Sequence, residues 1–406
     1  MQNVETKRFK FKKDLIWPFA LTLFFTININ YDWRTSYFAW YGTLFLVLIS
    51  YLYVFNGRIP LKLGGFSLWF VSFAMLCVFS MAWSLSASTS FVVIKSFIVF
   101  FAVLLLIQFS LQYGFDINVI LKCYLIATLI NAIYVLITVD LTQLGETQLG
   151  THMLEGWNGN GIGFLASNGA IIACYLIGRS KHIAEKILYI ISVLGLSFLT
   201  LYTGSRTAFL VLLIELMLYL CLVNPAKTAT KILVAFGVVV VVFILVMNVE
   251  PLYNVLGSRI EGLLNLWTGE GAADSSASIR QTFIDNGIQW FKEQPLAGYG
   301  INNYKILNQE ATGRFTYAHN NFIEIAVDLG ILGLIFYYFV FVYLIGHLIK
   351  IVKKHPMNAF LLSMLVASLV GQYGTVSYYD FFQNLLILMC FFAIESCGKE
   401  SEIVRQ

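Results

Sequence analysis

Long apolar runs are the feature of this sequence that most limits how it can fold. A membrane-spanning helix needs roughly 20 consecutive apolar residues, and twelve runs approach that length. They lie near residues 15–30, 36–56, 66–84, 91–111, 117–139, 161–178, 186–203, 206–223, 229–248, 330–349, 358–376 and 382–396. Of the 406 residues, 59% are hydrophobic and 12% are charged, whereas a soluble domain carries about 25% charged residues. The sequence therefore excludes a soluble globular enzyme and predicts an all-α polytopic membrane protein with about 12 transmembrane helices.

The basic residues are distributed unevenly between the connections of these spans. If the amino terminus is cytoplasmic, the basic clusters fall on the cytoplasmic side, as the positive-inside rule requires. The clusters are Lys7 to Lys13, Arg58 with Lys62, Arg179 to Lys186, Lys227 with Lys231, Lys350 to Lys354, and Lys399. We therefore place both termini inside. The net charge of +4 follows from this topology, so no nucleic-acid partner is implied.

One long hydrophilic stretch, Val249 to Ala318, falls outside between the ninth and tenth spans. Loops of this length are usually functional. The chain therefore divides into transmembrane helices 1–9 (1–248), an external loop with short amphipathic helices (249–318), and transmembrane helices 10–12 with a cytoplasmic tail (319–406).

A capping-box pattern at Ser278 to Gln281 predicts the start of one helix in this loop. Its apolar face would hold Ile284, Ile288 and Phe291, and Pro295 with Gly298-Tyr299-Gly300 would end it. We expect this helix to lie on the membrane surface or against the bundle.

Topology leaves two histidines on the outer side, His152 and His319. His319 directly follows the long loop and opens a helix that continues into the tenth span. An imidazole there can act as a general base, because its ordinary pKa near 6.5 leaves it neutral at external pH. The alternative is an interfacial histidine that caps a helix. We interpret His152 as an ordinary loop residue.

Two arginines on the same side could bind phosphate. Arg206 ends Thr203-Gly204-Ser205-Arg206, a tight turn between the seventh and eighth spans. Such a turn offers backbone N–H groups at a helix start, and the guanidinium adds paired donors that match phosphate oxygens. The alternative for Arg206 is a snorkelling arginine. Arg280, in the loop helix, is either a second phosphate ligand or part of a solvated helix face.

Two further charged residues lie within predicted spans. Lys95, near the outer end of the fourth span, either adds positive charge to a lipid-phosphate pocket or snorkels. Glu215 should face the bundle interior, because an unpaired carboxylate inside a membrane costs about 2.5–3.5 kcal/mol.

Metal-ligand spacings, a P-loop and a GxSxG motif do not occur, so the sequence predicts chemistry without a metal or a cofactor.

Three motifs occur in a fixed order, with the long loop between the first and the last. The first is Thr203 to Ala208, the second is Arg280 ahead of Pro295 and Gly298-Tyr299-Gly300, and the third is His319-Asn320-Asn321-Phe322-Ile323-Glu324 followed by Asp328 to Leu334. This combination resembles the bacterial O-antigen ligase and polysaccharide polymerase superfamily. The resemblance covers roughly Thr203 to Leu334. It implies a metal-independent glycosyltransferase of the C-type membrane fold whose donor is a glycan linked to undecaprenyl diphosphate.

The resemblance also implies roles for individual residues. Arg206 and Arg280 would hold the donor diphosphate, and His319 would deprotonate the acceptor hydroxyl with inversion at the anomeric carbon. The supporting residues would be Asn320, Glu324 and Ser205, and Asn160 is a weaker match. We add Lys95 as a supporting residue because of its place near the outer end of the fourth span. Fixed arginines stabilise a diphosphate leaving group without a metal, and an alcohol nucleophile needs a positioned base, so the chemistry agrees with these roles.

The acceptor is either another lipid-linked repeat unit, which makes the chain an O-antigen or capsular polysaccharide polymerase, or the lipid A core, which makes it a ligase. The motifs look more like those of polymerases, which we favour. A polysaccharide or lipid transporter and a non-catalytic scaffold are alternatives of other classes. The resemblance further implies the bacterial cytoplasmic (inner) membrane, an active site on its extracytoplasmic face, and a flippase and a chain-length regulator as partner proteins.

Overall fold

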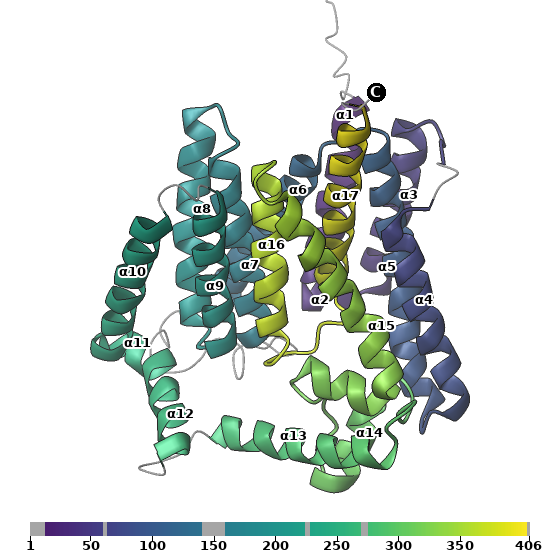
Figure 1. The fold of residues 1–406 in the computed structure, drawn as a ribbon, viewed down its shortest axis with the longest axis vertical. Coiled ribbons are helices and arrows are strands. Elements are labelled where there is room, and N and C mark those ends of the chain that lie inside the picture. The colour runs from purple at the N-terminus through teal and green to yellow at the C-terminus, as the bar shows by residue number, and fades with distance from the viewer. Residues whose placement is uncertain (1–12, 60–62, 140–158, 224–227, 269–274, 404–406) are drawn as a thin grey trace, which may run out of the picture.

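The computed structural model describes residues 13–59, 63–139, 159–223, 228–268 and 275–403 (Figure 1). This described part is 83% helical and contains no strand. Its helices are α1 (Lys13–Ile29), α2 (Tyr31–Thr35), α3 (Tyr37–Val54), α4 (Gly65–Ser80), α5 (Ala87–Gln112), α6 (Ile117–Thr138), α7 (Gly159–Ile177), α8 (Ile183–Tyr202), α9 (Arg206–Val223), α10 (Thr228–Asn248), α11 (Glu250–Leu252), α12 (Ser258–Thr268), α13 (Ser275–Glu293), α14 (Tyr304–Thr312), α15 (Asn321–Ile351), α16 (Pro356–Gly371) and α17 (Phe381–Ile403). A 3-10 turn (Met81–Trp83) follows α4, and a π-helical turn (Tyr253–Gly257) follows α11.

The predicted polytopic helical fold is confirmed. Eight of the described helices are long and apolar enough to cross a membrane, or nine if Val240–Asn248 and Glu250–Gly262, which meet at 94°, form one broken span. Three shorter apolar helices, Leu15–Ile29, Phe38–Val54 and Pro356–Gly371, occupy the other predicted positions. The total of twelve spans and the division into 1–248, 249–318 and 319–406 stay predictions.

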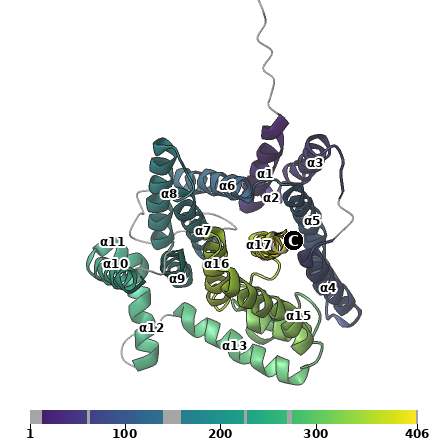
Figure 2. The same cartoon turned by 45° about the horizontal axis from the view of Figure 1, so that its top comes forward.

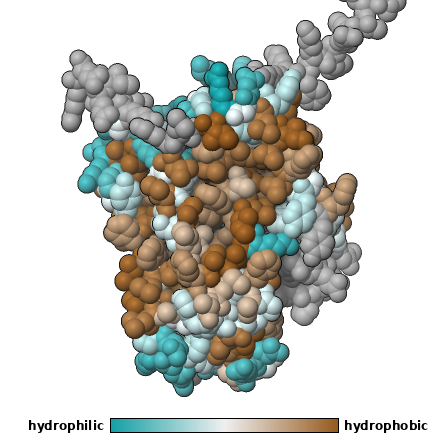
Figure 3. Space-filling view, turned by 90° about the vertical axis from the view of Figure 1, so that its right-hand side faces the viewer, coloured by the Kyte–Doolittle hydropathy of each residue, from teal (hydrophilic) through white to brown (hydrophobic). Residues whose placement is uncertain are grey.

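Helix α17 stands in the middle of the bundle (Figure 2). Every residue from Phe381 to Cys390 is buried, because this stretch carries bulky side chains on all faces and so needs neighbours all round. Helices α4, α5, α15 and α16 pack against it. On the periphery, Phe45 of α3 and Phe79 of α4 are 63% and 62% exposed. The face shown in Figure 3 has a broad hydrophobic band between two more hydrophilic ends. Apolar side chains that face outward in such a band are suited to contact lipid.

Helices α12 to α14 lie across one end of the bundle, which we call the α13 end (Figure 1). Helix α1 begins, and α17 ends, at the opposite end. The predicted loop therefore lies on the side away from the start of α1 and the end of α17, as the predicted topology requires. Which side faces the cytoplasm stays a prediction.

Helix α13 packs against α15, so the expected contact of the loop helix with the bundle is confirmed. It ends at Glu293, before Pro295, as predicted, but its predicted start and buried face were wrong. The helix already begins at Ser275, which puts the Ser278 capping box inside it, and its buried face carries Phe283 and Gly287, whereas Ile288 is 41% exposed. The reason is close approach, since a Cβ at position 287 would lie 2.2 Å from Cγ2 of Ile323. Only glycine allows α13 to pack this tightly.

Candidate functional site

His319 lies in a short segment that is fixed on both sides. Asn320 caps α15, because its Oδ1 accepts hydrogen bonds from the N–H groups of Phe322 (3.0 Å) and Ile323 (3.2 Å). Glu324 reaches back from the first turn, and its Oε2 accepts the N–H of Ala318 at 2.6 Å. His319 itself has a φ of 53°, in the left-handed region that non-glycine residues seldom adopt. The two flanking hydrogen-bond sets hold this unfavourable backbone conformation and thereby fix the direction of the imidazole.

The imidazole of His319 lies among aromatic rings. Its centroid is 4.1 Å from that of Tyr317 and 6.3 Å from that of Phe283, whose ring is nearly parallel at 12°. Nδ1 is buried and has no hydrogen-bond partner in the described part of the chain. Burial first, and the charge of Arg280 second, lower the pKa of His319 to about 4. The ring is therefore neutral at neutral pH and able to accept a proton.

The Thr203-Gly204-Ser205-Arg206 turn forms as predicted. Gly204 has a φ of 64°, and α9 begins at Arg206. The guanidinium of Arg206 donates from Nη1 to the carbonyl oxygen of Arg259 at 2.8 Å, and Nη1 of Arg259 donates to the carbonyl of Gly204 at 2.6 Å. This reciprocal pair joins α12 to the start of α9.

Arg259 was not among the predicted site residues. The sequence does contain a signal for it. The predicted outer connections hold few arginines, so each arginine there is a candidate site residue. Arg259 also donates from Nη2 to Oγ of Ser276 at 3.4 Å. Ser276 stands at the start of α13, about one helical turn before Arg280.

Helix α13 thus links the arginine pair to the histidine. It carries Arg280 and, three residues later, Phe283, so both lie on one side of the helix. Phe283 stacks on His319, and Arg280 lowers the pKa of that histidine. Arg206, Arg280 and His319, which are far apart in the sequence, are therefore connected along one surface at the α13 end. The positive charge of the two arginines favours an anionic ligand there.

Two predicted supporting residues have contacts of a different kind. Ser205 is 2% exposed and donates from Oγ to Oδ1 of Asn160 at 2.7 Å, so it ties the turn to α7 and is shielded from a ligand. Lys95 lies on α5 with Nζ 6.0 Å from the ring of Trp40 and 5.7 Å from that of Tyr41, which are cation–π contacts with α3. A role of Lys95 at the phosphate site stays a prediction. His152 lies outside the described residues.

The motifs around Gly298 and Gly330 interlock beneath the site. Helix α15 breaks at Gly330 (φ 63°, ψ −159°), and a Cβ there would lie 2.4 Å from the carbonyl of Leu296. The Asp328 carboxylate, just before the break, accepts N–H groups of Asn302 (2.7 Å), Asn303 (3.0 Å) and Tyr304 (2.8 Å) at the start of α14. This interlock sets the position of the first turns of α15, and with them the position of His319.

Glu215 faces the bundle interior, as predicted. It is 1% exposed and accepts a hydrogen bond from Oγ of Ser167 at 3.0 Å.

Among the described residues, no group of three or more His, Cys, Asp or Glu side chains is arranged to hold a metal ion.

The comparison with known families agrees with this geometry. Residues 190–338 match the family model described as O-antigen ligase. This part of the chain is similar to an O-antigen ligase domain. This domain begins within α8 and ends within α15, so it includes Arg206, Arg259, Arg280 and His319. The resemblance found in the sequence is thereby confirmed. A search of curated proteins found no match.

Proposed function

We propose that this protein is a membrane glycosyltransferase that moves a glycan from undecaprenyl diphosphate to a sugar hydroxyl. The observation that carries the proposal is His319, a neutral imidazole with a lowered pKa, fixed beside Arg280 on an arginine-rich surface. The O-antigen ligase domain supports the same class of reaction, since this family transfers glycosyl groups.

In the proposed mechanism, Arg206 and Arg280 bind the donor diphosphate. Their guanidinium groups stabilise the negative charge that grows on the diphosphate as the glycosidic C–O bond breaks. The electron pair of that bond leaves with undecaprenyl diphosphate. Arg259 supports this step by holding the backbone of the Gly204 turn, and therefore the start of α9, in place.

His319 supplies the base in this mechanism. The acceptor hydroxyl oxygen attacks the anomeric carbon from the face opposite the diphosphate, and its proton passes to the imidazole. We propose that Nε2 is the nitrogen that takes up this proton, because Nδ1 is buried. Attack from the opposite face inverts the anomeric configuration. Asn320 and Glu324 act as positioning residues through the hydrogen bonds that fix the segment on either side of His319.

Two acceptors are compatible with this site. The sequence motifs favour a polymerase that adds one lipid-linked repeat unit to another, as in O-antigen or capsule synthesis. The description of the matching family favours a ligase that transfers the glycan to lipid A core. In both cases the proposal places the protein in the bacterial inner membrane with its site on the extracytoplasmic face, where a flippase would deliver the donor. For the polymerase, a chain-length regulator would be a further partner.

The products of the purified protein test this proposal. Incubation with a synthetic undecaprenyl diphosphate repeat unit alone should give a ladder of longer glycans if the protein is a polymerase. Transfer that requires added lipid A core would identify a ligase. The reaction should continue in the presence of a chelator. Loss of all transfer with chelator would contradict the metal-independent mechanism, and no transfer to either acceptor would contradict the proposed function.

A further inference from the structure

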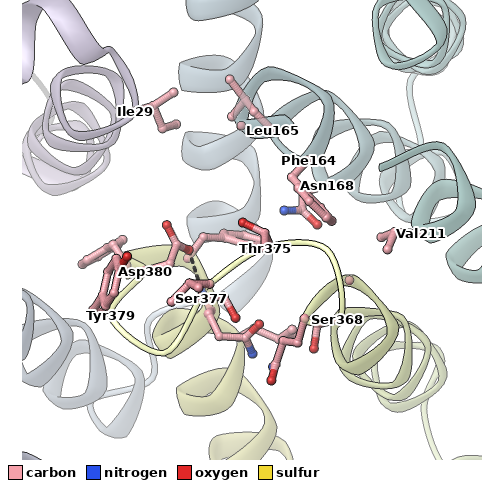
Figure 4. Close-up of a pocket in the computed structure, with 18 of the residues that line it drawn as sticks. Ile29, Phe164, Leu165, Asn168, Val211, Ser368, Thr375, Ser377, Tyr379 and Asp380 are labelled. Atoms are coloured by element: carbon pink, nitrogen blue, oxygen red, sulfur yellow. Dashed lines mark hydrogen bonds between the residues drawn. The ribbon is translucent and has the colours of Figure 1, made fainter. Parts of the chain in front are cut away.

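A cavity of about 340 Å³ lies inside the bundle, apart from the arginine and histidine surface (Figure 4). Its walls come from α1, α5, α6, α7, α9, α16, α17 and the connection between α16 and α17. The lining includes Ile29 at the end of α1, Gly161 near the start of α7 and Gln372 after the end of α16, so the cavity starts at one end of these helices. It extends to Glu215, about 13 Å along α9 from Arg206. Its volume falls in the range of small-molecule sites, about 300–1,000 Å³.

One wall of the cavity directly joins the proposed catalytic residues. The carbonyl oxygen of Gln372 accepts the N–H of Asn321 at 2.8 Å, and Asn321 is the second residue after His319. The side chain of Asn321 in turn accepts the N–H of Ser377 at 2.9 Å. On the other side, a Cβ at Gly374 would lie 2.4 Å from Oγ1 of Thr207, the residue after Arg206. The α16–α17 connection therefore lies between the start of α9 and the start of α15.

Several polar atoms of the lining are buried without a partner. Nε2 of Gln372, Nε2 of Gln383 and Oδ1 of Asn28 have no hydrogen-bond partner in the described part of the chain, and these residues are 1%, 6% and 9% exposed. More than 90% of buried polar groups in proteins are paired. Asn168 also points into the cavity, near Thr375 (Figure 4). These amides therefore retain unused hydrogen-bonding capacity in the wall of the cavity.

The chemistry of the lining selects the class of ligand. Among the described residues, two carboxylates, Glu215 and Asp380, line the cavity and no lysine or arginine does, so a diphosphate is disfavoured. The aromatic rings of Tyr379 and Phe382 add apolar surface. A sugar ring matches this combination, because its hydroxyl groups both donate and accept hydrogen bonds while its C–H face packs on aromatic rings. We propose that this cavity binds a sugar residue of one of the two glycan substrates, a role that rests on the proposed function.

Variants that remove amides from the lining test the proposal. Asn168→Leu and Gln383→Leu should each raise the KM for one glycan substrate, the donor or the acceptor, by roughly 3- to 10-fold, because each removes a hydrogen-bonding group. The kcat should stay within about twofold, since neither residue touches the reacting atoms. Gln108→Leu is the matched control, a 5% exposed amide on α5 outside the cavity, and it should leave both KM values unchanged. Unchanged KM values in both cavity variants would overturn the proposal.

A second measurement does not depend on transfer. Thr375→Cys places a thiol in the cavity wall, whereas Ser88→Cys is an exposed control at the start of α5, outside the lining. The probe is the repeat-unit oligosaccharide released by mild acid from the lipid-linked glycan of the host cell. It should slow alkylation of the first thiol at least about threefold and leave the second unchanged, as read by mass spectrometry of the labelled peptides.

The two measurements separate the sugar site from the transferase. Protection of Thr375→Cys by the oligosaccharide, in a protein that transfers no glycan, would keep the sugar site and reject the proposed function. Transfer without protection, and with unchanged KM values in the cavity variants, would reject the sugar site alone. Protection by sodium chloride instead of the oligosaccharide would identify a cation site and also overturn the proposal.

Discussion

The lowered pKa of His319 makes a quantitative prediction for the pH dependence of the reaction. The proposed base must be neutral, so activity should be lost only as the pH falls through the pKa of about 4. At pH 5 about 90% of such imidazoles are neutral, whereas an imidazole with the ordinary pKa of 6.5 would be only about 3% neutral. The wild-type enzyme should therefore keep most of its rate at pH 5. An enzyme whose base had the ordinary pKa would be about thirtyfold slower at that pH.

The assay is the initial rate of transfer between pH 3.5 and 8 at a donor concentration well below its KM, because that rate reports the pKa of the donor-free enzyme. A sample held at each pH and returned to pH 7.5 must recover its rate, which shows that the fold survived. In Arg280→Gln the acid midpoint should move upward but stay below 6.5, because burial is the larger cause of the shift and Arg280 the smaller. An acid midpoint near 6.5 in the wild-type enzyme would refute this account of the imidazole.

Three further predictions test other parts of the structure. Arg206→Lys keeps the charge but loses the paired donors, so transfer should fall about 100-fold, and a rate close to wild type would remove Arg206 from the diphosphate site. Gly330→Ala should lower the midpoint of thermal unfolding in detergent, because its Cβ would lie 2.4 Å from backbone atoms, whereas Gly346→Ala on the same helix has no neighbour within 4 Å and should be neutral. Ser276→Cys should react with an impermeant maleimide in intact cells and Ser180→Cys only after permeabilisation, and the opposite pattern would reverse the topology.

The sequence predicts those parts of the fold that depend on neighbouring residues. Apolar runs identify the helices of the bundle because lipid requires every backbone group to be paired within its own segment. The turn at Gly204 and the start of α15 after His319 were also predicted correctly, since a glycine turn and a capping asparagine act within a few residues.

Other features depend on contacts between distant parts of the chain and could not be predicted. Arg259 reaches Gly204 across 55 residues, and Asp328 caps a helix that begins 24 residues earlier. The buried face of α13 is set by Gly287, which packs against Ile323, and not by its most apolar side chains. No local sequence pattern predicts the cavity between α1, α7, α9 and α17, because its lining comes from distant parts of the chain.

The most direct test of the central claim is the transfer rate of His319→Ala in purified protein. A general base contributes about 10²–10⁴-fold, so the variant should lose at least 100-fold in rate while it still binds the lipid-linked donor. His347→Ala, at the far end of the same helix, is the matched control and should transfer at the wild-type rate. Transfer by His319→Ala at the wild-type rate would contradict the proposed mechanism.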